Sequence, residues 1–315
     1  MMNQYSKCIR LSFTAVLLLA VVSGSDAGNR SGTVSGQFLK IPLSARAVGM
    51  GGAQVAVAEG VSSIGFNPAG MMSVESYAFG ATYTAWFANI QHSYVGIVKN
   101  IPDVGAIGAS LTLLATDDME VTTPARPDGT GEFFRASDYA FSIAYARQVS
   151  DKFMVGLNGK YIKSYLYNTD LGAASFAFDI GTLYDIPILR SRLGVSLTNI
   201  GKDMQFLNEP YSLPTSLRLG ILVDVMKEDV HALKTTFQIS RNNDAEEQYN
   251  LGGEYVFNGM FALRGGWKFA YDAENLTAGF GANLTSYGIN GKFDYGYNNF
   301  KYLPGTHSFT INIQF

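Results

Sequence analysis

The chain has 315 residues, of which 16% are charged, and its formal net charge is −3. Soluble domains carry about 25% charged residues and nucleic-acid-binding domains carry a basic surface, so this composition argues against both classes. Glycine contributes 34 residues, tyrosine 18 and phenylalanine 21, and this content in a chain poor in charge predicts strands that cross a membrane.

Residues 1–27 have the pattern of a cleaved secretory signal peptide. Lys7 and Arg10 precede an apolar run from Leu11 to Val22, and the run is followed by the small residues of a cleavage site near Ala27. The alternative is a single membrane anchor, but the run is shorter than the roughly 20 residues that a spanning helix needs. The only cysteine, Cys8, lies within this segment, so the exported chain is expected to form no disulfide.

Residues 28–76 do not alternate and are rich in Gly, Ala and Ser. Asn67 followed by Pro68 favours the start of a short helix, and Gly70 is expected to end it. Small residues permit close backbone packing, so this segment is predicted to fold inside the following barrel as a hatch, or plug. The alternative is an exposed periplasmic tail, which the low charge of the segment disfavours.

From residue 77 to the C-terminus the dominant pattern has a period of two, which is typical of β-strands. Tyr139, Phe141 and Ile143, for example, alternate with Ala140 and Ser142. Most segments have the length that a tilted strand needs to cross hydrocarbon, about 9–11 residues. The fourteen predicted strands cover residues 77–88, 92–100, 105–117, 137–148, 153–164, 173–185, 191–200, 215–225, 231–241, 247–257, 260–270, 275–285, 287–298 and 305–315.

The charges inside these segments fall on the less apolar face, apart from Lys163 at a strand end. A charge facing lipid at mid-depth costs about 2–4 kcal/mol, so this distribution favours a wall whose apolar face contacts lipid. A soluble β-sandwich or barrel would instead need a solvated face rich in charge. The charges on the less apolar face are Lys160, Asp179, Arg218, Asp224, Lys234, Glu254, Arg264, Lys268, Lys292 and Asp294.

The predicted fold is all-β, a closed antiparallel transmembrane β-barrel of about 14 strands over residues 77–315, with a small N-terminal hatch at 28–76. An even strand number puts both ends of the barrel on one side, and both termini are predicted to be periplasmic in a bacterial outer membrane. Connections on that side are short, and Asn258-Gly259 favours a type I′ hairpin turn. The longest connections, Asp118–Ala136 and Gly201–Pro214, share the opposite side.

The last strand ends in an aromatic residue, a feature that the outer-membrane assembly machinery reads. Apolar residues occupy alternate positions at Phe309, Ile311, Ile313 and Phe315. These residues predict an assembly signal, with the barrel-assembly machinery and outer-membrane lipid as partners. The alternative is an ordinary terminal strand of any β protein.

Two blocks of the hatch carry a family resemblance. The first runs from Ala45 to Ala53 as Ala-Arg-Ala-x-Gly-Met-Gly-Gly-Ala, after Phe38-Leu39-Lys40-Ile41, and the second is Asn67-Pro68-Ala69-Gly70. They resemble the start of the PorV/PorQ family, which is related to the FadL-type channels for hydrophobic compounds. The resemblance implies an outer-membrane barrel with a hatch. It also implies a part in type IX secretion, with secreted cargo proteins or other secretion components as partners. The hatch motif comprises Arg46, Gly49, Gly51, Gly52, Asn67, Pro68, Ala69 and Gly70.

Catalysis has little support in the sequence. His92, His231 and His307 lie on separate segments with no convincing nucleophile or carboxylate partner, and no nucleotide-binding or metalloprotease pattern occurs. We therefore expect no enzyme activity, no cofactor and no metal site, and no nucleic acid as partner. The residues expected to face the lumen are Trp86, Arg218, Glu254 and Arg264.

Three functions follow from this reading. The preferred hypothesis is a non-enzymatic component of protein secretion or surface attachment, of the PorV/PorQ type. The alternatives are a FadL-like passive transporter of small hydrophobic compounds and a plugged structural barrel. A continuous apolar tunnel lined by Phe and Leu would favour transport, whereas a lumen filled by residues 28–76 and charge pairs would favour protein partners.

Overall fold

The structure is a computed structural model that describes residues 32–167, 171–285, 288 and 290–315. The predicted signal peptide, residues 1–27, lies outside the described residues. In the part of the chain that is described, no helix is long and apolar enough to cross a membrane.

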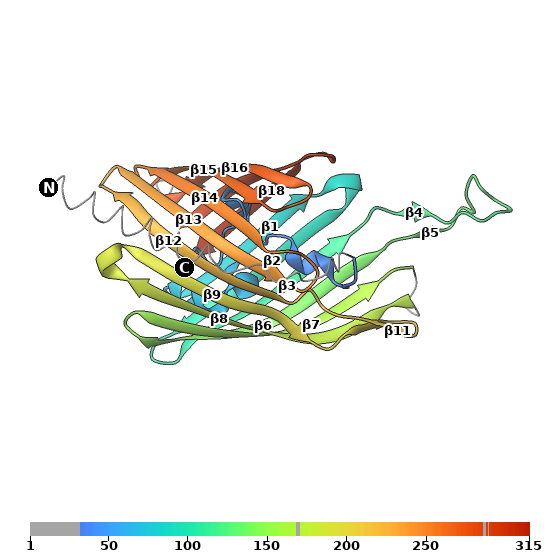
Figure 1. Cartoon of the computed structure of the whole chain (residues 1–315), viewed down its shortest axis with the longest axis horizontal. Coiled ribbons are helices and arrows are strands. Elements are labelled where there is room, and N and C mark those ends of the chain that lie inside the picture. Colours follow the sequence, from blue (N-terminus) through green and yellow to red (C-terminus); the bar gives the residue numbers. More distant parts are fainter. Residues whose placement is uncertain (1–31, 168–170, 286–287, 289) are drawn as a thin grey trace.

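Fourteen long strands form one closed antiparallel barrel (Figure 1). Each of the fourteen predicted segments forms one of them, so the predicted fold is confirmed. Long strands that follow one another along the chain pair side by side, and β1 pairs with β18 to close the wall. Their bounds are β1 Tyr77–Ala85, β2 Gln91–Ile101, β3 Gly105–Ala115, β6 Ser137–Ser150, β7 Phe153–Tyr165, β8 Ala173–Ile186, β9 Ser191–Gly201, β12 Ser216–Lys227, β13 His231–Asn242, β14 Gln248–Phe257, β15 Phe261–Phe269, β16 Glu274–Asn283, β17 Gly291–Phe300 and β18 Thr306–Gln314.

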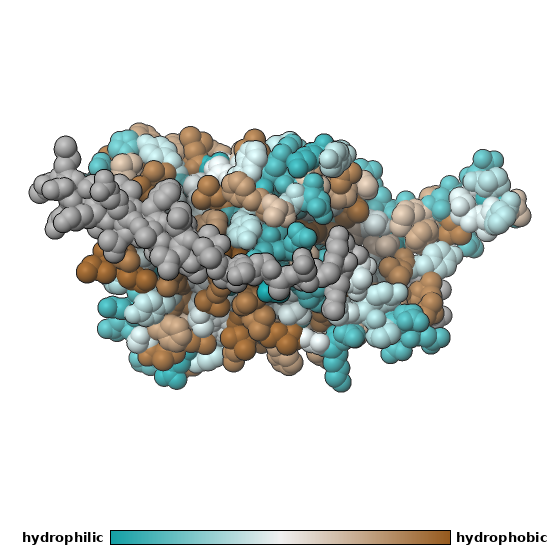
Figure 2. All heavy atoms as spheres, viewed as in Figure 1, coloured by the Kyte–Doolittle hydropathy of each residue, from teal (hydrophilic) through white to brown (hydrophobic). Residues whose placement is uncertain are grey.

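The two faces of the wall differ as the alternation requires. On β8 the side chains of Phe176 and Phe178 point outward and are 61% and 63% exposed, whereas Ala177 and Asp179 point into the barrel and are fully buried. Figure 2 shows hydrophobic residues spread over the outside of the wall. An apolar outer face with charges on the inner face is the arrangement that lipid requires.

The connections sort by length to the two ends of the barrel. At one end, here called the short-turn end, tight turns include Asn258 and Gly259, whose φ angles of 52° and 65° are those of the predicted hairpin turn. The opposite end, here called the long-loop end, carries two small sheets that the sequence did not predict. These sheets pair β4 (Met119–Glu120) with β5 (Phe133–Phe134), and β10 (Met204–Phe206) with β11 (Glu209–Tyr211). The arm that contains β4 and β5 projects beyond the barrel (Figure 1).

The hatch, residues 32–76 of the described chain, lies inside the barrel. It contains four short helices, η1 (Gln37–Lys40), α2 (Ala45–Gly49), α3 (Ser63–Phe66) and η2 (Pro68–Ser73). Helix α2 packs against β15 to β18, and η2 packs against β6, β7 and β8 on another part of the wall. Ile64 and Met71 of the hatch are fully buried in one apolar cluster with Val98 and Ala144 of the wall, so the core of the molecule lies between hatch and barrel.

The hatch runs from one end of the lumen to the other. Val34 forms a β-bridge with Ser212 in the long-loop region. The backbone oxygen of Val74 accepts a 2.8 Å hydrogen bond from Asn100 at the short-turn end. The C-terminal Phe315 also lies at the short-turn end, where its backbone nitrogen donates to Tyr77. The two ends of the barrel, Tyr77 and Phe315, therefore share one side as predicted. The N-terminus of the exported chain lies outside the described residues, and the first residues that are described lie at the long-loop end.

Candidate functional site

Asn67 joins the second hatch block to the barrel wall. It is fully buried and is the N-cap of η2, with Pro68 at the first position and its side-chain oxygen accepting from the backbone nitrogen of Ala69. Its Nδ2 donates to the backbone oxygens of Val55 at 3.0 Å and Thr182 at 2.9 Å. One side chain therefore ties two parts of the hatch to β8.

Two wall glycines allow this block to approach. A Cβ atom at Gly181 would lie 2.1 Å from Oδ1 of Asn67, and one at Gly156 would lie 2.3 Å from the backbone nitrogen of Ala69. Neither distance is compatible with van der Waals radii. Glycine at these positions therefore decides how closely the wall can meet the hatch.

The first hatch block turns through two left-handed residues. Gly51 and Gly52 have φ angles of 69° and 74°, which side chains with a Cβ rarely adopt. The turn is fixed to the wall because the nitrogen of Gly51 donates to Oγ1 of Thr277 at 2.9 Å and its oxygen accepts from Nδ2 of Asn250 at 2.6 Å. A Cβ atom at Gly51 would also lie 2.6 Å from a backbone oxygen of β14.

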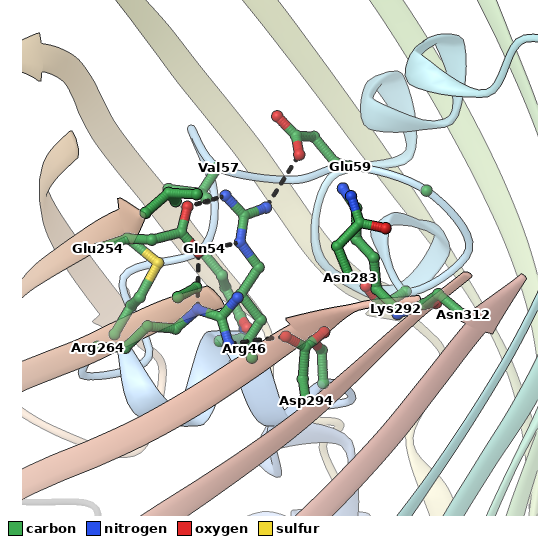
Figure 3. Close-up of a pocket in the computed structure, with 18 of the residues that line it drawn as sticks. Arg46, Gln54, Val57, Glu59, Glu254, Arg264, Asn283, Lys292, Asp294 and Asn312 are labelled. Carbon is green, nitrogen blue, oxygen red and sulfur yellow. Dashed lines mark hydrogen bonds and ion pairs between the residues drawn. The ribbon is translucent and has the colours of Figure 1, made fainter. Parts of the chain in front are cut away.

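Arg46 is the centre of an ion-pair network between hatch and wall (Figure 3). Its Nε and Nη2 each donate to the carboxylate of Glu254 at 2.8 Å, and its Nη1 donates to Glu59 of the hatch at 2.9 Å. Glu254 also accepts from Nε of Arg264 at 2.7 Å, and Nη1 of Arg264 lies 2.7 Å from Asp294. The side chains of Glu254, Arg264 and Asp294 are each at most 5% exposed, so each charge is compensated where water is scarce.

The register of the wall explains how the network forms. Glu254 on β14 is directly opposite Arg264 on β15, but Asp294 lies on β17, beyond β16. The guanidinium of Arg264 crosses β16 over Gly281, where a Cβ atom would lie 2.7 Å from Nη2. The network therefore depends on a glycine at position 281 as well as on its five charged residues.

A second buried cluster holds the hatch on the far side of the lumen. Nζ of Lys160 lies 2.7 Å from the carboxylate of Asp179, which also accepts from Nδ2 of Asn158 and the backbone nitrogen of Asn199. Asn158 donates in addition to the backbone oxygen of Ile64 in α3, at 3.1 Å. The hatch is thus anchored to two opposed groups of strands.

Two cavities in the described part of the chain lie between hatch and wall, and Gln54 of the hatch lines both. The short-turn cavity has a volume of about 480 Å³. Its roof is the hatch from Ser44 to Ser62, and its walls include Lys234, Glu254, Met260, Arg264, Asn283, Lys292, Asp294, Asn312 and Gln314. Charged and amide side chains share the lining of this cavity about equally with apolar ones such as Met50 and Phe261, so it is not a purely apolar site.

The long-loop cavity, of about 390 Å³, has one apolar and one polar wall. Phe38, Ile41, Trp86, Ile90 and Leu114 form the apolar wall, and Arg218, Gln238, Asn250, Lys268 and Glu274 contribute to the polar one. Lys268 is paired with Glu274. Arg218 is buried and donates to Oγ1 of Thr198 at 3.1 Å, but no carboxylate of the described chain lies within ion-pair distance of it.

Asp244 fixes η1 over the long-loop cavity. Nζ of Lys40 lies 2.6 Å from both of its carboxylate oxygens, and Nε2 of Gln37 donates to it at 2.9 Å. Burial opposes ionisation of Asp244, but the hydrogen bonds from Gln37 and Lys40 outweigh it and lower the pKa of Asp244. The Asp244 carboxylate therefore holds the N-terminal part of the hatch in place through an ion pair and a hydrogen bond.

The residues expected to face the lumen occupy different parts of it. Trp86 lies in the connection after β1, lines the long-loop cavity and packs its ring against Phe87 and Phe300. Arg218 lines the same cavity, whereas Glu254 and Arg264 belong to the ion-pair network. The residues of the predicted assembly signal lie on β18, where Phe309 and Ile311 face outward, and at the C-terminal Phe315, which is also exposed.

Several residues of the site were not predicted from the sequence. Glu59 and Asp244 lie outside the alternating segments, and nothing in their local sequence distinguishes them from solvated acids. Gln238 was also missed, although it accepts from the backbone nitrogens of Gln54 and Val55 at 2.9 Å. Its place on the inner face of β13 follows from parity, which was the available signal.

Comparisons with known proteins agree on the type of barrel. The sequence model of the family described as "Type IX secretion system protein PorV" matches residues 24–243. The fold is similar to that of the monoaromatic hydrocarbon channel CymD, at 14% identity and a TM-score of 0.62 over 87% of this chain and 97% of that one. No curated protein matches the sequence.

Two further solved structures have the same fold. The toluene transporter TbuX of Ralstonia pickettii is 15% identical, with a TM-score of 0.59 over 86% of this chain and 98% of that one. A FadL homologue of Pseudomonas aeruginosa is 10% identical, with a TM-score of 0.58 over the same shares of the two chains. At these identities the likeness concerns the fold, an outer-membrane barrel of the FadL type.

Proposed function

The chain belongs to the PorV family of type IX secretion system proteins and has the FadL-like outer-membrane barrel fold, and from this premise we propose that it is a non-enzymatic component of protein secretion or surface attachment. In this role it binds a segment of a secreted protein at the long-loop end, which faces the cell exterior. The observation that carries the proposal is the long-loop cavity above a closed hatch, since a closed lumen favours holding a partner over passing a solute.

The chemistry of the long-loop cavity suits a polypeptide segment. Its apolar wall, with Trp86 and Leu114, can bury aliphatic or aromatic side chains. Its polar wall offers amides, which both donate and accept hydrogen bonds as a peptide backbone does. Arg218 supplies a buried cation that has no carboxylate partner among the described residues, and a cargo carboxylate would supply one.

Passive transport of small hydrophobic compounds is the alternative function, and the solved structures of the same fold include proteins named as hydrocarbon channels. Two features weigh against it in this chain. The hatch occupies part of the lumen between the two cavities, and charged side chains line both of them. A plugged structural barrel is the remaining alternative, and it gives no reason for a buried arginine in the long-loop cavity that forms no ion pair with any described residue.

The proposal is tested in the native bacterium by deleting the gene and following the secreted proteins. We expect type IX cargo to accumulate in the periplasm, and the wild-type gene to restore its export. The Arg218→Gln and Trp86→Ala variants are expected to restore export less well. Lys227→Gln, at an exposed position at the short-turn end of β12, is the matched control. Normal export in the deletion strain, together with reduced uptake of an aromatic hydrocarbon, would contradict the secretion hypothesis and favour the transport hypothesis.

A further inference from the structure

The short-turn cavity extends beyond the ion-pair network that anchors the hatch to the wall. Its volume of about 480 Å³ falls within the range of small ligand pockets, about 300–1,000 Å³. The turn at Gly259 and Met260 and the end of β16 at Asn283 line it together with the ends of β17 and β18. It is therefore reached from the short-turn end, which is the periplasmic side of an outer-membrane barrel.

Two ammonium groups that line this cavity form no ion pair with a described carboxylate. Among the described residues, four cations and three carboxylates line it. Arg46 and Arg264 form ion pairs with all three carboxylates, those of Glu59, Glu254 and Asp294. The remaining cations are Lys234 and Lys292. No carboxylate of the described chain lies within ion-pair distance of either, and Figure 3 shows Lys292 across the pocket from Glu254.

Amide side chains also line the short-turn cavity. Asn283, Asn312 and Gln314 lie on the ends of the wall strands around it, and their side chains can both donate and accept hydrogen bonds. Gln54 of the hatch lines both cavities, but its side-chain oxygen is itself buried, so it is not counted as a ligand contact.

We propose that the short-turn cavity binds an acidic peptide segment of a periplasmic partner protein. Carboxylates of the peptide pair with Lys234 and Lys292, and its backbone N–H and C=O groups pair with the amides of Asn283, Asn312 and Gln314. A small inorganic anion would use the two ammonium groups but would leave these amides without a partner. The two lysines line this cavity and not the long-loop cavity, so this binding does not depend on cargo recognition at the other end.

The test uses the full-length protein in lipid nanodiscs, where both ends of the barrel are open to solution. The probe is a capped peptide, acetyl-Gly-Asp-Gly-Glu-Gly, with a fluorophore on a flexible C-terminal linker, and its partner peptide has Asn and Gln in place of Asp and Glu. Fluorescence anisotropy is expected to show a Kd for the acidic peptide that is about tenfold lower than the Kd for the amide peptide. The preference should shrink as salt rises.

Variants locate the site. The double substitution Lys234→Gln and Lys292→Gln is expected to remove the preference, whereas Lys152→Gln, on an exposed turn at the same end, should leave it unchanged. Lys292→Glu should reverse it in favour of a lysine-containing peptide. Retention of the heat-dependent gel shift of a folded barrel shows that each variant is intact.

A blocking experiment separates this site from the cargo site. A bulky label on cysteine introduced at Met260 should prevent binding of the acidic peptide, and the same label at Leu207, in the long-loop region, should not. Equal binding of the acidic and amide peptides would overturn the proposal, as would an unchanged preference in the double lysine variant. Blocking by the Leu207 label alone would assign the acidic peptide to the long-loop cavity and would also overturn it.

Discussion

Arg46 and Glu254 lie 208 residues apart in the sequence and form a two-point ion pair, with both hydrogen bonds 2.8 Å long. Arg46 belongs to the hatch and Glu254 to the wall, so this pair joins the closing element to the barrel. The same carboxylate accepts a third hydrogen bond, from Arg264. One acidic side chain therefore holds two guanidinium groups, and its loss would leave both without their main partner.

Glu254→Gln is expected to destabilise the barrel strongly. Removing one member of a buried ion pair costs about 3–5 kcal/mol, since the remaining charge is left uncompensated. Denaturant unfolding of the protein in lipid vesicles measures this loss. The control is Glu247→Gln, because Glu247 pairs at 3.7 Å with Arg241, which is 52% exposed, and such surface pairs contribute about 0–1 kcal/mol. Equal stability of the two variants would contradict the anchoring role of Glu254.

Gly181→Ala is expected to displace the Asn67 block of the hatch. The added Cβ would lie 2.1 Å from Oδ1 of Asn67, and overpacking of this kind costs about 1–3 kcal/mol. Proteolysis within the hatch should become faster. Gly265→Ala is the matched control, since a Cβ at that position meets no atom within 4 Å. Equal resistance of both alanine variants and the wild type to protease would contradict the close contact between Gly181 and the Asn67 block of the hatch.

The contacts of Asp244 with Lys40 and Gln37, which hold η1 in place, are expected to weaken in acid. The pKa of Asp244 is lowered in the folded protein from an ordinary value of about 3.9, so the carboxylate binds its proton less readily when folded. Its contribution to stability is therefore complete above about pH 5. That contribution is lost as the pH falls below about 4 and through the lower pKa of the folded state.

A spin label at position 33, in a chain with Cys8 replaced by Ser, reports this change. Its mobility should rise as the pH falls through that range. In Asp244→Asn the label should be mobile already at neutral pH, with little further change in acid. If the mobility of the label in the chain that keeps Asp244 does not change down to pH 3, Asp244 does not hold η1 in place.

A charge on the outer face should cost most in the middle of a strand. Ile143 lies mid-way along β6 and is 59% exposed, whereas Val149 lies near the end of the same strand and is 64% exposed. Ile143→Lys is expected to cost about 2–4 kcal/mol in a bilayer and Val149→Lys about 0–1 kcal/mol. Equilibrium folding into lipid vesicles measures both. Equal costs would mean that the apolar face does not contact lipid as inferred.

The strands could be predicted because two independent signals agree along them. Apolar residues recur at every second position, and charges such as Lys160 and Asp179 keep to the other face, which the structure shows as the lumen side. The sheets of β4 with β5 and β10 with β11 were missed, since strands of two or three residues are too short to display a period. Their pairing depends on where the long loops are held.

The interior of the site was predictable only in part. Parity put Glu254 and Arg264 on the inner face, and glycine content signalled close packing of the hatch. The partner of Arg46 could not be read from the sequence, because it depends on which strands the hatch meets after the barrel closes. The same holds for Gly281, whose role in letting Arg264 reach Asp294 follows from three strands in register.

Closure of the lumen by the hatch is tested most directly by ionic conductance of the purified protein in a planar lipid bilayer. With residues 32–76 in place, we expect no steady open steps from the wild type, whereas a variant lacking these residues should conduct, since the lumen of a barrel widens with strand number. Steady steps from the wild type, equal in size to those of the variant without the hatch, would contradict closure of the lumen by the hatch.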